Sequence, residues 1–337
     1  MIIVLKPGVS KEDKDSITGQ IKDLGLKPVS FDGDERTVIN VIGNVLETQR
    51  EHFRSLRVVE DVVRIVKPYK LASKEHHTQK TVIKVGGVKI GNSDFTVIAG
   101  PDSVESKEQI LESARIMKEN GIKIMRASAF KPRTSPYEFQ GMGIEGLKLL
   151  KMAGDEIGIL TETEVMDVRD VPICAEYIDI LRVGARNMQN FDLLKELGKI
   201  DNPVILKRGM AATLKEFLMA AEYIIASGNP NVILCERGIR TFETAYRNTL
   251  DLEGVAVLKT ETHLPIIVDP SHAAGKRDLV LPLALASAAV GADGLLVEVH
   301  PDPEKALCDG AQSLYPHQLT TMLEKLRPIC KAMGRKL

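Results

Sequence analysis

The chain has 337 residues, of which 44% are hydrophobic and 27% are charged, and its formal net charge is −1. This composition is typical of a folded globular protein and excludes disordered chains, collagen-like repeats and coiled coils. The balanced charge provides no bulk attraction to nucleic acid or to anionic lipid, so we expect neither as a partner.

Targeting and redox signals are absent from the sequence. No uninterrupted apolar run approaches the ~20 residues that span a bilayer, and the first residues lack a basic region ahead of a long apolar core. We therefore expect a cytoplasmic protein without membrane contact. The 4 cysteines are widely spaced and form no C-x-x-C pair. They match neither a disulfide framework nor a zinc finger, so we expect them to stay reduced.

Residues 1–70 read as strand, helix, strand, strand, helix, strand. Ser10 is a candidate N-cap for a helix at 11–24 with apolar side chains on one face, and a second helix is predicted at 46–56. Apolar runs predict strands at 2–5, 27–31, 37–42 and 58–66. This order is the split βαβ, or ferredoxin-like, pattern and predicts a domain of its own.

Residues 71–93 read as a linker followed by a β-hairpin. His76 and His77 lie in a charged stretch, so we expect both side chains to be solvated rather than to bind metal. Gly86-Gly87 separates two short apolar runs and supplies the positive φ of a tight turn. We expect the hairpin to close one end of the following domain.

Residues 94–337 alternate short β-rich runs with amphipathic helical stretches, which is typical of parallel βα units. The predicted strands are 95–99, 123–127, 159–163, 178–183, 203–207, 232–236, 265–269 and 294–299. Their number and order predict an α/β fold, a (β/α)8 TIM barrel. A doubly wound open sheet is less favoured because no G-x-G-x-x-G follows the first strand and no phosphate-binding P-loop motif occurs.

Nearly every predicted strand ends in charged residues, where a barrel of this kind carries its active site. Cations recur in a protein without net positive charge: Arg126, Lys131, Arg133, Arg186, Lys207, Arg208 and Arg237. Arginine forks fit phosphate and carboxylate bidentately, so the set predicts phosphorylated, anionic substrates. Alternatively, some of these cations only pair with Glu162, Glu236 and Asp269.

A second group combines one imidazole with three carboxylates on loops after the first, seventh and eighth strands. Its members are Asp102, His272, Glu298 and Asp309. Oxygen-rich ligation with one histidine suits Mn²⁺, Fe²⁺ or Mg²⁺ better than a thiophilic metal. From spacing alone, an ordinary polar network remains an alternative.

Seven motifs in chain order resemble one enzyme family across essentially the whole chain. They are the segments 99–106, 131–137, 184–187, 206–209, 235–238, 269–272 and 298–301. The sequence resembles 3-deoxy-D-arabino-heptulosonate 7-phosphate (DAHP) synthases with an N-terminal ferredoxin-like, ACT-like regulatory domain. The resemblance implies condensation of phosphoenolpyruvate with erythrose 4-phosphate, the first step of the shikimate pathway to aromatic amino acids.

The resemblance also implies roles for individual residues. Positions matching those that hold phosphoenolpyruvate are Arg126, Lys131, Arg186, Lys207 and Arg237, and we group Ala185 and Glu236 with this site. The loop with Lys131, Arg133, Thr134 and Ser135 is expected to receive the aldose phosphate. We expect a divalent metal on Asp102, His272, Glu298 and Asp309, with Lys131, Asp102 and His272 as catalytic residues. Lys131 acts either as general acid at the aldehyde oxygen or only as a bound charge.

Two departures from the family pattern affect these expectations. Where relatives usually have a metal-binding cysteine, this chain has Asp102. A carboxylate is a harder donor, so we expect Mn²⁺ or Mg²⁺ to be preferred over Zn²⁺, Cu²⁺ or Cd²⁺, or metal dependence to be lost. The segment 126–130 reads Arg-Ala-Ser-Ala-Phe instead of Arg-Gly-Gly-Ala-Tyr, which predicts a reshaped mouth at the second strand.

Other activities are alternatives to DAHP synthesis for this barrel. The nearest rival is a 3-deoxy-octulosonate 8-phosphate synthase, but its relatives have Lys-Ala-Asn-Arg-Ser where this chain has Lys-Pro-Arg-Thr-Ser at 131–135. Other rivals are a Schiff-base aldolase using Lys207 or Lys131, and a disabled barrel that only binds sugar phosphates.

By resemblance, we expect feedback inhibition by tyrosine or phenylalanine, bound between N-terminal domains of a homotetramer.

Overall fold

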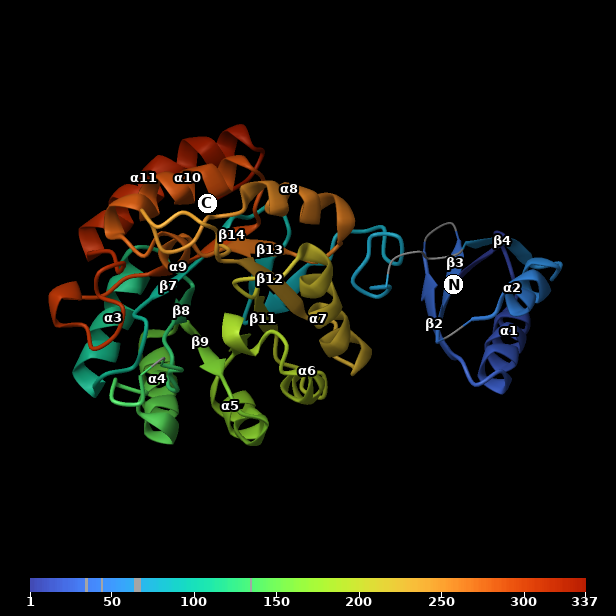
Figure 1. Ribbon diagram of the computed structural model, residues 1–337, viewed down its shortest axis with the longest axis horizontal. Helices are drawn as coiled ribbons and strands as arrows, with labels where there is room; N and C mark the ends of the chain where they lie inside the picture. Colours follow the sequence, from blue (N-terminus) through green and yellow to red (C-terminus); the bar gives the residue numbers. More distant parts are fainter. Residues whose placement is uncertain (34–35, 44, 64–67, 134) are drawn as a thin grey trace. The chain divides into compact units, whose positions relative to one another are not determined.

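The computed structural model describes residues 1–33, 36–43, 45–63, 68–133 and 135–337. The chain forms two compact units, Met1–His76 and His77–Leu337. Figure 1 traces the elements of both along the sequence.

The first unit is an antiparallel sheet with two helices. Its strands lie in the order β2-β3-β1-β4, so the first strand of the chain is central. The helices are α1 (Lys11–Asp23), whose N-cap is Ser10, and α2 (Glu47–Arg54). The strands are β1 (Ile2–Leu5), β2 (Lys27–Asp32), β3 (Thr37–Ile42) and β4 (Val59–Val63).

Burial of one apolar face of the sheet and of both helices holds this unit together. Ile3 and Ile39 of the sheet, Ile21 of α1 and Phe53 of α2 are each 0% exposed and belong to one cluster. The expected ferredoxin-like architecture is confirmed. Residues 64–66 of the last predicted strand lie outside the described residues.

The end of this unit differs from the expected solvated linker. His76 is only 7% exposed, and its ring meets Phe31 edge-on at 4.3 Å between centroids. Leu71 and Ala72 are also buried. The prediction of two solvated histidines is therefore wrong for His76, because a charged sequence context does not reveal an apolar partner far away in the chain.

A short hairpin opens the second unit and closes one end of its barrel. Strands β5 (Ile83–Val85) and β6 (Val88–Ile90) pair antiparallel. Gly86 and Gly87 have φ of 47° and 81°, which a two-residue turn of this hand requires. Ile83 and Ile90 are fully buried in a cluster with residues from the barrel strands, as the sequence led us to expect.

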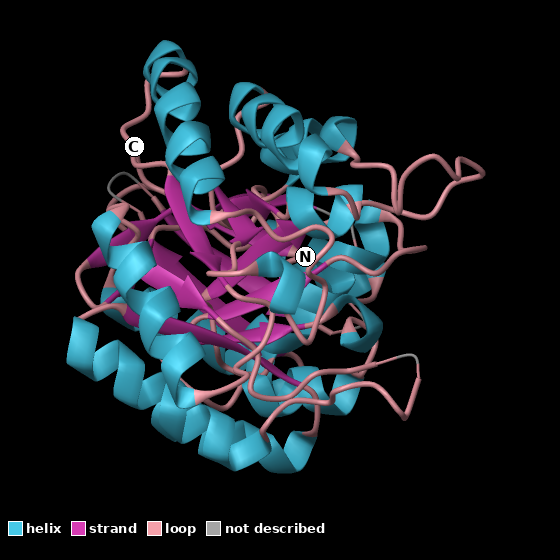
Figure 2. Cartoon of the chain, turned by 90° about the vertical axis from the view of Figure 1, so that its left-hand side faces the viewer, coloured by secondary structure: helices cyan, strands magenta, loops and turns pink. Residues whose placement is uncertain are grey.

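Among the described residues, eight parallel strands close into a barrel in the order β10-β11-β12-β13-β14-β7-β8-β9. Figure 2 shows these strands surrounded by helices. The expected (β/α)8 barrel is confirmed. The strands are β7 (Thr96–Gly100), β8 (Ile124–Arg126), β9 (Leu160–Val165), β10 (Ile180–Val183), β11 (Val204–Lys207), β12 (Val232–Glu236), β13 (Ile266–Val268) and β14 (Gly294–Glu298).

The helices cover the outside of the barrel. They are α3 (Lys107–Glu119), α4 (Gly143–Ile157), α5 (Val171–Tyr177), α6 (Phe191–Leu197), α7 (Leu214–Ala226), α8 (Leu252–Glu261), α9 (Pro270–Ala274), α10 (Arg277–Ala289) and α11 (Pro316–Ala332). Short 3₁₀ turns lie at Val168–Asp170, Ala185–Asn187 and Pro303–Lys305. Within the described part of the chain, no helix is both long and apolar enough to cross a bilayer.

The strand ends position the site. Because parallel barrel strands all run the same way, their carboxyl ends meet at one face. Strand β9 runs two residues beyond the predicted end at 163, which places Glu164 on the strand itself. After β13, the short helix α9 is capped by Asp269 and carries His272 in its first turn.

Candidate active site

The carboxyl end of the barrel encloses a cavity of about 250 Å³ lined mostly by charged side chains. Of the residues predicted from the sequence, Lys131, Arg133, Ala185, Arg186, Lys207, Arg237, His272 and Asp309 line it. Pro132, Glu138, Glu164, Arg182, Gly184, Met210 and Arg247 complete the lining. A small, strongly cationic cavity at this face is suited to a compact anionic ligand.

Several predicted residues do not line this cavity. Asp102, Arg126, Glu236 and Glu298 are each at most 1% exposed and lie behind the cavity wall. Ser135 is half-buried on the loop after β8 and is not part of the lining. Thr134 lies outside the described residues.

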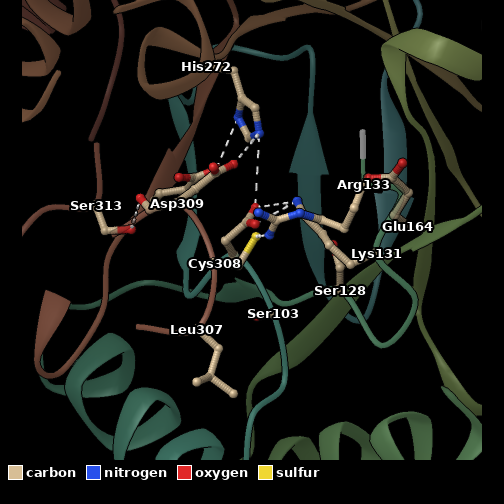
Figure 3. Close-up of polar contacts among 12 residues, drawn as sticks. Ser103, Ser128, Lys131, Arg133, Glu164, His272, Leu307, Cys308, Asp309 and Ser313 are labelled. Atoms are coloured by element: carbon tan, nitrogen blue, oxygen red, sulfur yellow. Dashed lines mark hydrogen bonds and ion pairs between the residues drawn. The ribbon is translucent and has the colours of Figure 1, made fainter. Parts of the chain in front are cut away.

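Asp102, His272, Glu298 and Asp309 lie together. Each offers one atom to a group in which all four atoms are within 4.8 Å of one another. His272 Nδ1 lies 3.1 Å from Glu298 Oε1, and its Nε2 lies 3.9 Å from one oxygen each of Asp102 and Asp309. Figure 3 shows His272 and Asp309 approaching one another.

The electrostatics of this group suit a divalent cation. Burial lowers the pKa of His272 well below its usual value, so the imidazole is neutral and its unprotonated ring nitrogen can bind a metal. Burial and the neighbouring Asp102 charge raise the pKa of Glu298 well above its usual range. Crowded carboxylates beside a neutral imidazole are relieved by a bound cation, so this donor set fits a metal ion.

Asp102 is already held by two cations. Its Oδ1 accepts hydrogen bonds at 2.7 Å from Arg126 Nη2 and at 2.7 Å from Lys131 Nζ. Lys131 Nζ also lies 2.6 Å from the other oxygen, Oδ2. Burial alone would raise the pKa of the Asp102 carboxyl, but the charges of Lys131 and Arg126 hold it well below its usual range.

Arg126 contacts two residues of the acidic group and does not line the cavity. Its side chain is 0% exposed, and besides Asp102 it donates to Glu298 Oε1 at 3.0 Å. A buried ion pair of this kind is costly to break, because each charge is left uncompensated when its partner is removed. Arg126 therefore fixes Asp102 and Glu298 relative to one another.

Lys131 and Lys207 differ in their electrostatic surroundings. Burial alone would lower the pKa of Lys131, but the Asp102 and Glu164 carboxylates raise it, so the ammonium stays protonated. Lys207 Nζ lies 2.5 Å from Asp269 Oδ2 and 3.4 Å from His272 Nδ1. Burial lowers its pKa despite this carboxylate.

Glu236 is occupied by protein partners. Arg208 Nη1 donates to one of its oxygens at 2.9 Å, and the Gly238 amide donates to the other at 2.6 Å. Arg208 also contacts Asp251 at 2.7 Å. Arg208 and Glu236 therefore form an internal ion pair, which was the alternative to a role in binding substrate.

Arg237 is the clearest candidate to bind an anion from the cavity. It is 4% exposed, and its Nε and Nη1 have no hydrogen-bond partner among the described residues. Burial lowers the pKa of its guanidinium. A buried cation with unused donors is strongly stabilised by an anionic ligand.

Sequence reasoning missed a network inside the barrel around Arg182. This guanidinium donates to Glu162 at 2.7 Å, to Glu164 at 3.0 Å and to the Ser128 hydroxyl at 2.8 Å. The available signal was an arginine inside an otherwise apolar strand, β10. Ser128 is one of the two glycine positions at which this chain departs from the family pattern, and its hydroxyl is used here.

Sequence reasoning also missed Cys308, which precedes Asp309. It is 3% exposed, and its thiol is within hydrogen-bonding reach of the Asp102 carboxylate. Arg133 Nη1 donates to its sulfur. Burial raises the pKa of the free thiol. No spacing motif pointed to this cysteine, because its neighbours lie about 200 residues earlier in the chain.

Comparison with known proteins agrees with this geometry. A family model described as "DAHP synthetase I family" matches residues 71–333. A second model, "DAHP synthase ferredoxin-like domain", matches residues 1–67. The chain belongs to the DAHP synthetase I family. The family expected from the sequence motifs is thereby confirmed, and with it the two-part organisation of barrel and ferredoxin-like domain.

Named relatives are similar to this chain over all or most of its length. The chain is 51% identical over 337 residues to the phospho-2-dehydro-3-deoxyheptonate aldolase of Thermotoga maritima, covering 100% of both. A crystal structure of that DAHP synthase has a TM-score of 0.79, covering 99% of this chain and 98% of its own. A 2-dehydro-3-deoxyphosphooctonate aldolase of Syntrophobacter fumaroxidans is 32% identical over 265 residues, covering 73% of this chain and 91% of its own.

Proposed function

We propose that this DAHP synthetase I family member condenses phosphoenolpyruvate with erythrose 4-phosphate to give DAHP and inorganic phosphate. The observation that carries the proposal is the cationic cavity at the barrel mouth, beside the acidic group. In it, Nε and Nη1 of Arg237 have no hydrogen-bond partner among the described residues. The full-length identity to the Thermotoga aldolase supports the choice of reaction. The product would enter the shikimate pathway.

The cavity residues would hold the two anionic substrates in register. Arg186, Lys207 and Arg237 line it with basic side chains that suit the phosphate and carboxylate of phosphoenolpyruvate. Arg133, which also lines the cavity, would receive the aldose phosphate together with the adjacent loop. Holding both reactants in one small volume converts a bimolecular reaction into an effectively unimolecular one.

The acidic group would hold a divalent metal, as is usual in this family. His272, Glu298, Asp309 and Asp102 would supply the donors, and their oxygen-rich set favours Mn²⁺ or Mg²⁺. When bound, the metal would act as a Lewis acid toward the aldehyde carbonyl.

In the proposed condensation, C3 of the enol would bond to the aldehyde carbon while the aldehyde oxygen takes up a proton. Water would add at C2 and lose a proton, and the C2–O bond to the phosphate would break to release inorganic phosphate. The cations around the cavity would stabilise the negative charge of the phosphate groups.

Lys131 would donate the proton to the aldehyde oxygen. It lines the cavity, and the raised pKa of its ammonium keeps that proton available at neutral pH. The alternative is that Lys131 only neutralises Asp102, which it contacts at 2.6 Å. A Lys131→Arg variant keeps the charge, so a large loss of kcat in it would favour the general acid.

A Schiff-base mechanism is a second candidate for the same substrates. Its specific support is Lys207, because a buried lysine with a lowered pKa is a common nucleophile toward carbonyl groups. Treating the enzyme with borohydride during turnover would trap such an adduct. Because Lys207 lies 2.5 Å from Asp269, we expect no trapped adduct.

The reaction itself is tested by mixing the full-length protein and Mn²⁺ with phosphoenolpyruvate and each of two aldoses. We expect loss of phosphoenolpyruvate and equimolar phosphate release with erythrose 4-phosphate, and much slower loss with arabinose 5-phosphate. Faster turnover of the five-carbon aldose would instead make the chain a 3-deoxy-octulosonate 8-phosphate synthase, the activity suggested by the Syntrophobacter relative. No turnover with either aldose would contradict both assignments and favour a barrel that only binds sugar phosphates.

We further propose that the first unit regulates the barrel in response to tyrosine or phenylalanine, within a homotetramer. It has a hydrophobic core of its own and matches the family's ferredoxin-like domain. The acidic and cationic cluster described above is built entirely from residues of the second unit. A unit that folds separately from the reactive groups is suited to binding an effector rather than to catalysis.

A further inference from the structure

Asp309 has an unusual backbone conformation. Its φ is 50°, and among the described residues it is the only non-glycine residue with a positive φ. An L-residue adopts this left-handed region at an energetic cost and keeps it only where its surroundings hold it. Asp309 is also one of the four residues of the acidic group. The contacts that hold its backbone therefore also decide where its carboxylate lies.

Arg277 holds the turn of residues 309–313, which begins with this aspartate. Its guanidinium donates from Nη2 to the Gly310 carbonyl at 2.9 Å and from Nε to the Ser313 carbonyl at 2.6 Å. Its backbone amide donates to the Ala311 carbonyl at 3.1 Å. Because the guanidinium is planar, its two donors fix the two carbonyls relative to one another, which a single point charge does not do.

Arg277 is itself held in place and connects two parts of the acidic group. Its guanidinium carbon lies 4.4 Å from the centre of the Tyr315 ring, and its Nη2 lies 3.6 Å from Glu304 Oε1. It is the first residue of α10, which closely follows the short helix that carries His272. Figure 3 shows Asp309 turned toward His272. One side chain thus ties the segment of His272 to the turn of Asp309.

The same turn contacts the acidic group from within. The Ser313 hydroxyl donates to the Asp309 carbonyl at 3.2 Å. The Gln312 side chain, which is 3% exposed, donates from Nε2 to Glu298 Oε2 at 2.8 Å. Arg277, in contrast, does not line the cavity and offers no atom to the acidic group. Any effect of Arg277 on that group therefore passes through the turn.

We propose that Arg277 is a positioning residue of the metal site, which holds Asp309 in its left-handed conformation with the carboxylate facing His272. This inference rests on the proposed metal dependence of the reaction. Without Arg277, the turn is free to relax toward an ordinary backbone conformation, which takes the Asp309 carboxylate away from the other donors. Metal binding then has to restore the strained conformation, so the affinity for the metal falls.

Binding of Mn²⁺ to the full-length protein tests the inference. Electron paramagnetic resonance of unbound Mn²⁺ gives the Kd for the wild type, Arg277→Ala, Arg277→Lys and Lys276→Ala. The exposed Lys276 is the matched control, because it is the neighbouring residue and also donates to a carbonyl, that of Ala245, at 2.6 Å. We expect a Kd raised about 10- to 100-fold in Arg277→Ala and unchanged in Lys276→Ala. Arg277→Lys should show a smaller rise, since lysine keeps the charge but not the planar fork.

A double-mutant cycle separates positioning from general damage to the fold. If Arg277 acts through Asp309, then Asp309→Ala and Arg277→Ala/Asp309→Ala have the same Kd for Mn²⁺. A further rise in the double variant, an unchanged Kd in both Arg277 variants, or no binding of Mn²⁺ by the wild type would overturn the inference. Circular dichroism checks that each variant is folded, and Arg277→Lys against Lys276→Ala decides the question if Arg277→Ala does not fold.

Turnover of phosphoenolpyruvate with erythrose 4-phosphate is measured on the same samples. Turnover by the wild type together with an unchanged Kd in the Arg277 variants removes this inference and leaves the proposed reaction intact. A raised Kd in Arg277→Ala without turnover by the wild type removes the proposed reaction and supports the positioning role.

Discussion

At the scale of single residues, Arg237 carries the most direct consequence of the cavity's charge. Its unused N–H donors predict that Arg237→Ala raises the KM for phosphoenolpyruvate about 10- to 100-fold, since a charge-assisted hydrogen bond contributes about 1.5–3 kcal/mol. Steady-state kinetics with varied phosphoenolpyruvate provide the measurement. Arg240→Ala, an exposed arginine of the same loop that does not line the cavity, is the control. An unchanged KM in Arg237→Ala would show that the anion binds elsewhere.

Ser128 tests the network inside the barrel. Ser128→Ala removes the hydroxyl that accepts from Arg182 at 2.8 Å and leaves a buried N–H without that acceptor. We expect the free energy of unfolding to fall by about 1–3 kcal/mol, measured by urea denaturation. Ser113→Ala is the matched buried control, because its hydroxyl bonds only a carbonyl of its own helix. Equal losses in the two variants would argue against a special role for Ser128.

The sequence predicts candidate residues better than it predicts their contacts. Charged residues at strand ends correctly indicated Lys131, Arg237 and His272 as residues that meet at one face. The ion pairs among the charged residues at this end of the barrel were not predictable, because their partners are far apart in sequence. Arg126, for example, contacts Glu298 across 172 positions of the chain. Cys308 was missed for the same reason.

At the scale of elements, Asp293 joins three segments at the opposite end of the barrel. This fully buried carboxylate contacts Lys80 at 2.5 Å, Lys259 at 2.9 Å and Arg335 at 2.8 Å. It therefore fixes the entry of the chain into the barrel, helix α8 and the C-terminal segment. Its position just before β14 explains how one side chain reaches all three.

Asp293→Asn leaves these cations without a compensating charge. We expect a loss of about 3–5 kcal/mol in the free energy of unfolding, because breaking a buried ion pair leaves the remaining charges unpaired. Thermal and urea denaturation measure it. The control Asp155→Asn removes an exposed pair with Lys151 and should cost at most about 1 kcal/mol. Comparable losses in both variants would contradict a structural role for the buried cluster.

Most elements follow from the sequence, whereas their boundaries do not. Alternating apolar runs and amphipathic helices predict each barrel strand. The observed strands differ from the prediction by at most two residues at either end, and β12 agrees with it at both ends. Such shifts arise because strand ends are set by hydrogen bonding to neighbouring strands, which a local pattern does not contain. The difference at β9 bears on the site, because the two residues beyond the predicted end include Glu164, which lines the cavity.

At the scale of the whole molecule, the division into two units predicts separable functions. A chain of residues 77–337 begins at the boundary between them. We expect tyrosine or phenylalanine to inhibit the full-length enzyme and to have no effect on the truncated one, with circular dichroism checking that the barrel remains folded. Equal sensitivity of the two forms would place the effector site in the barrel and contradict regulation by the first unit.

The most direct test of the account follows phosphoenolpyruvate consumption with erythrose 4-phosphate on full-length protein treated with EDTA, before and after Mn²⁺ is added. The group of His272, Glu298 and the neighbouring carboxylates predicts little turnover in the stripped protein and full turnover once metal is restored. Equal turnover in both samples would contradict a metal site, and absence of turnover in both would contradict the proposed condensation itself.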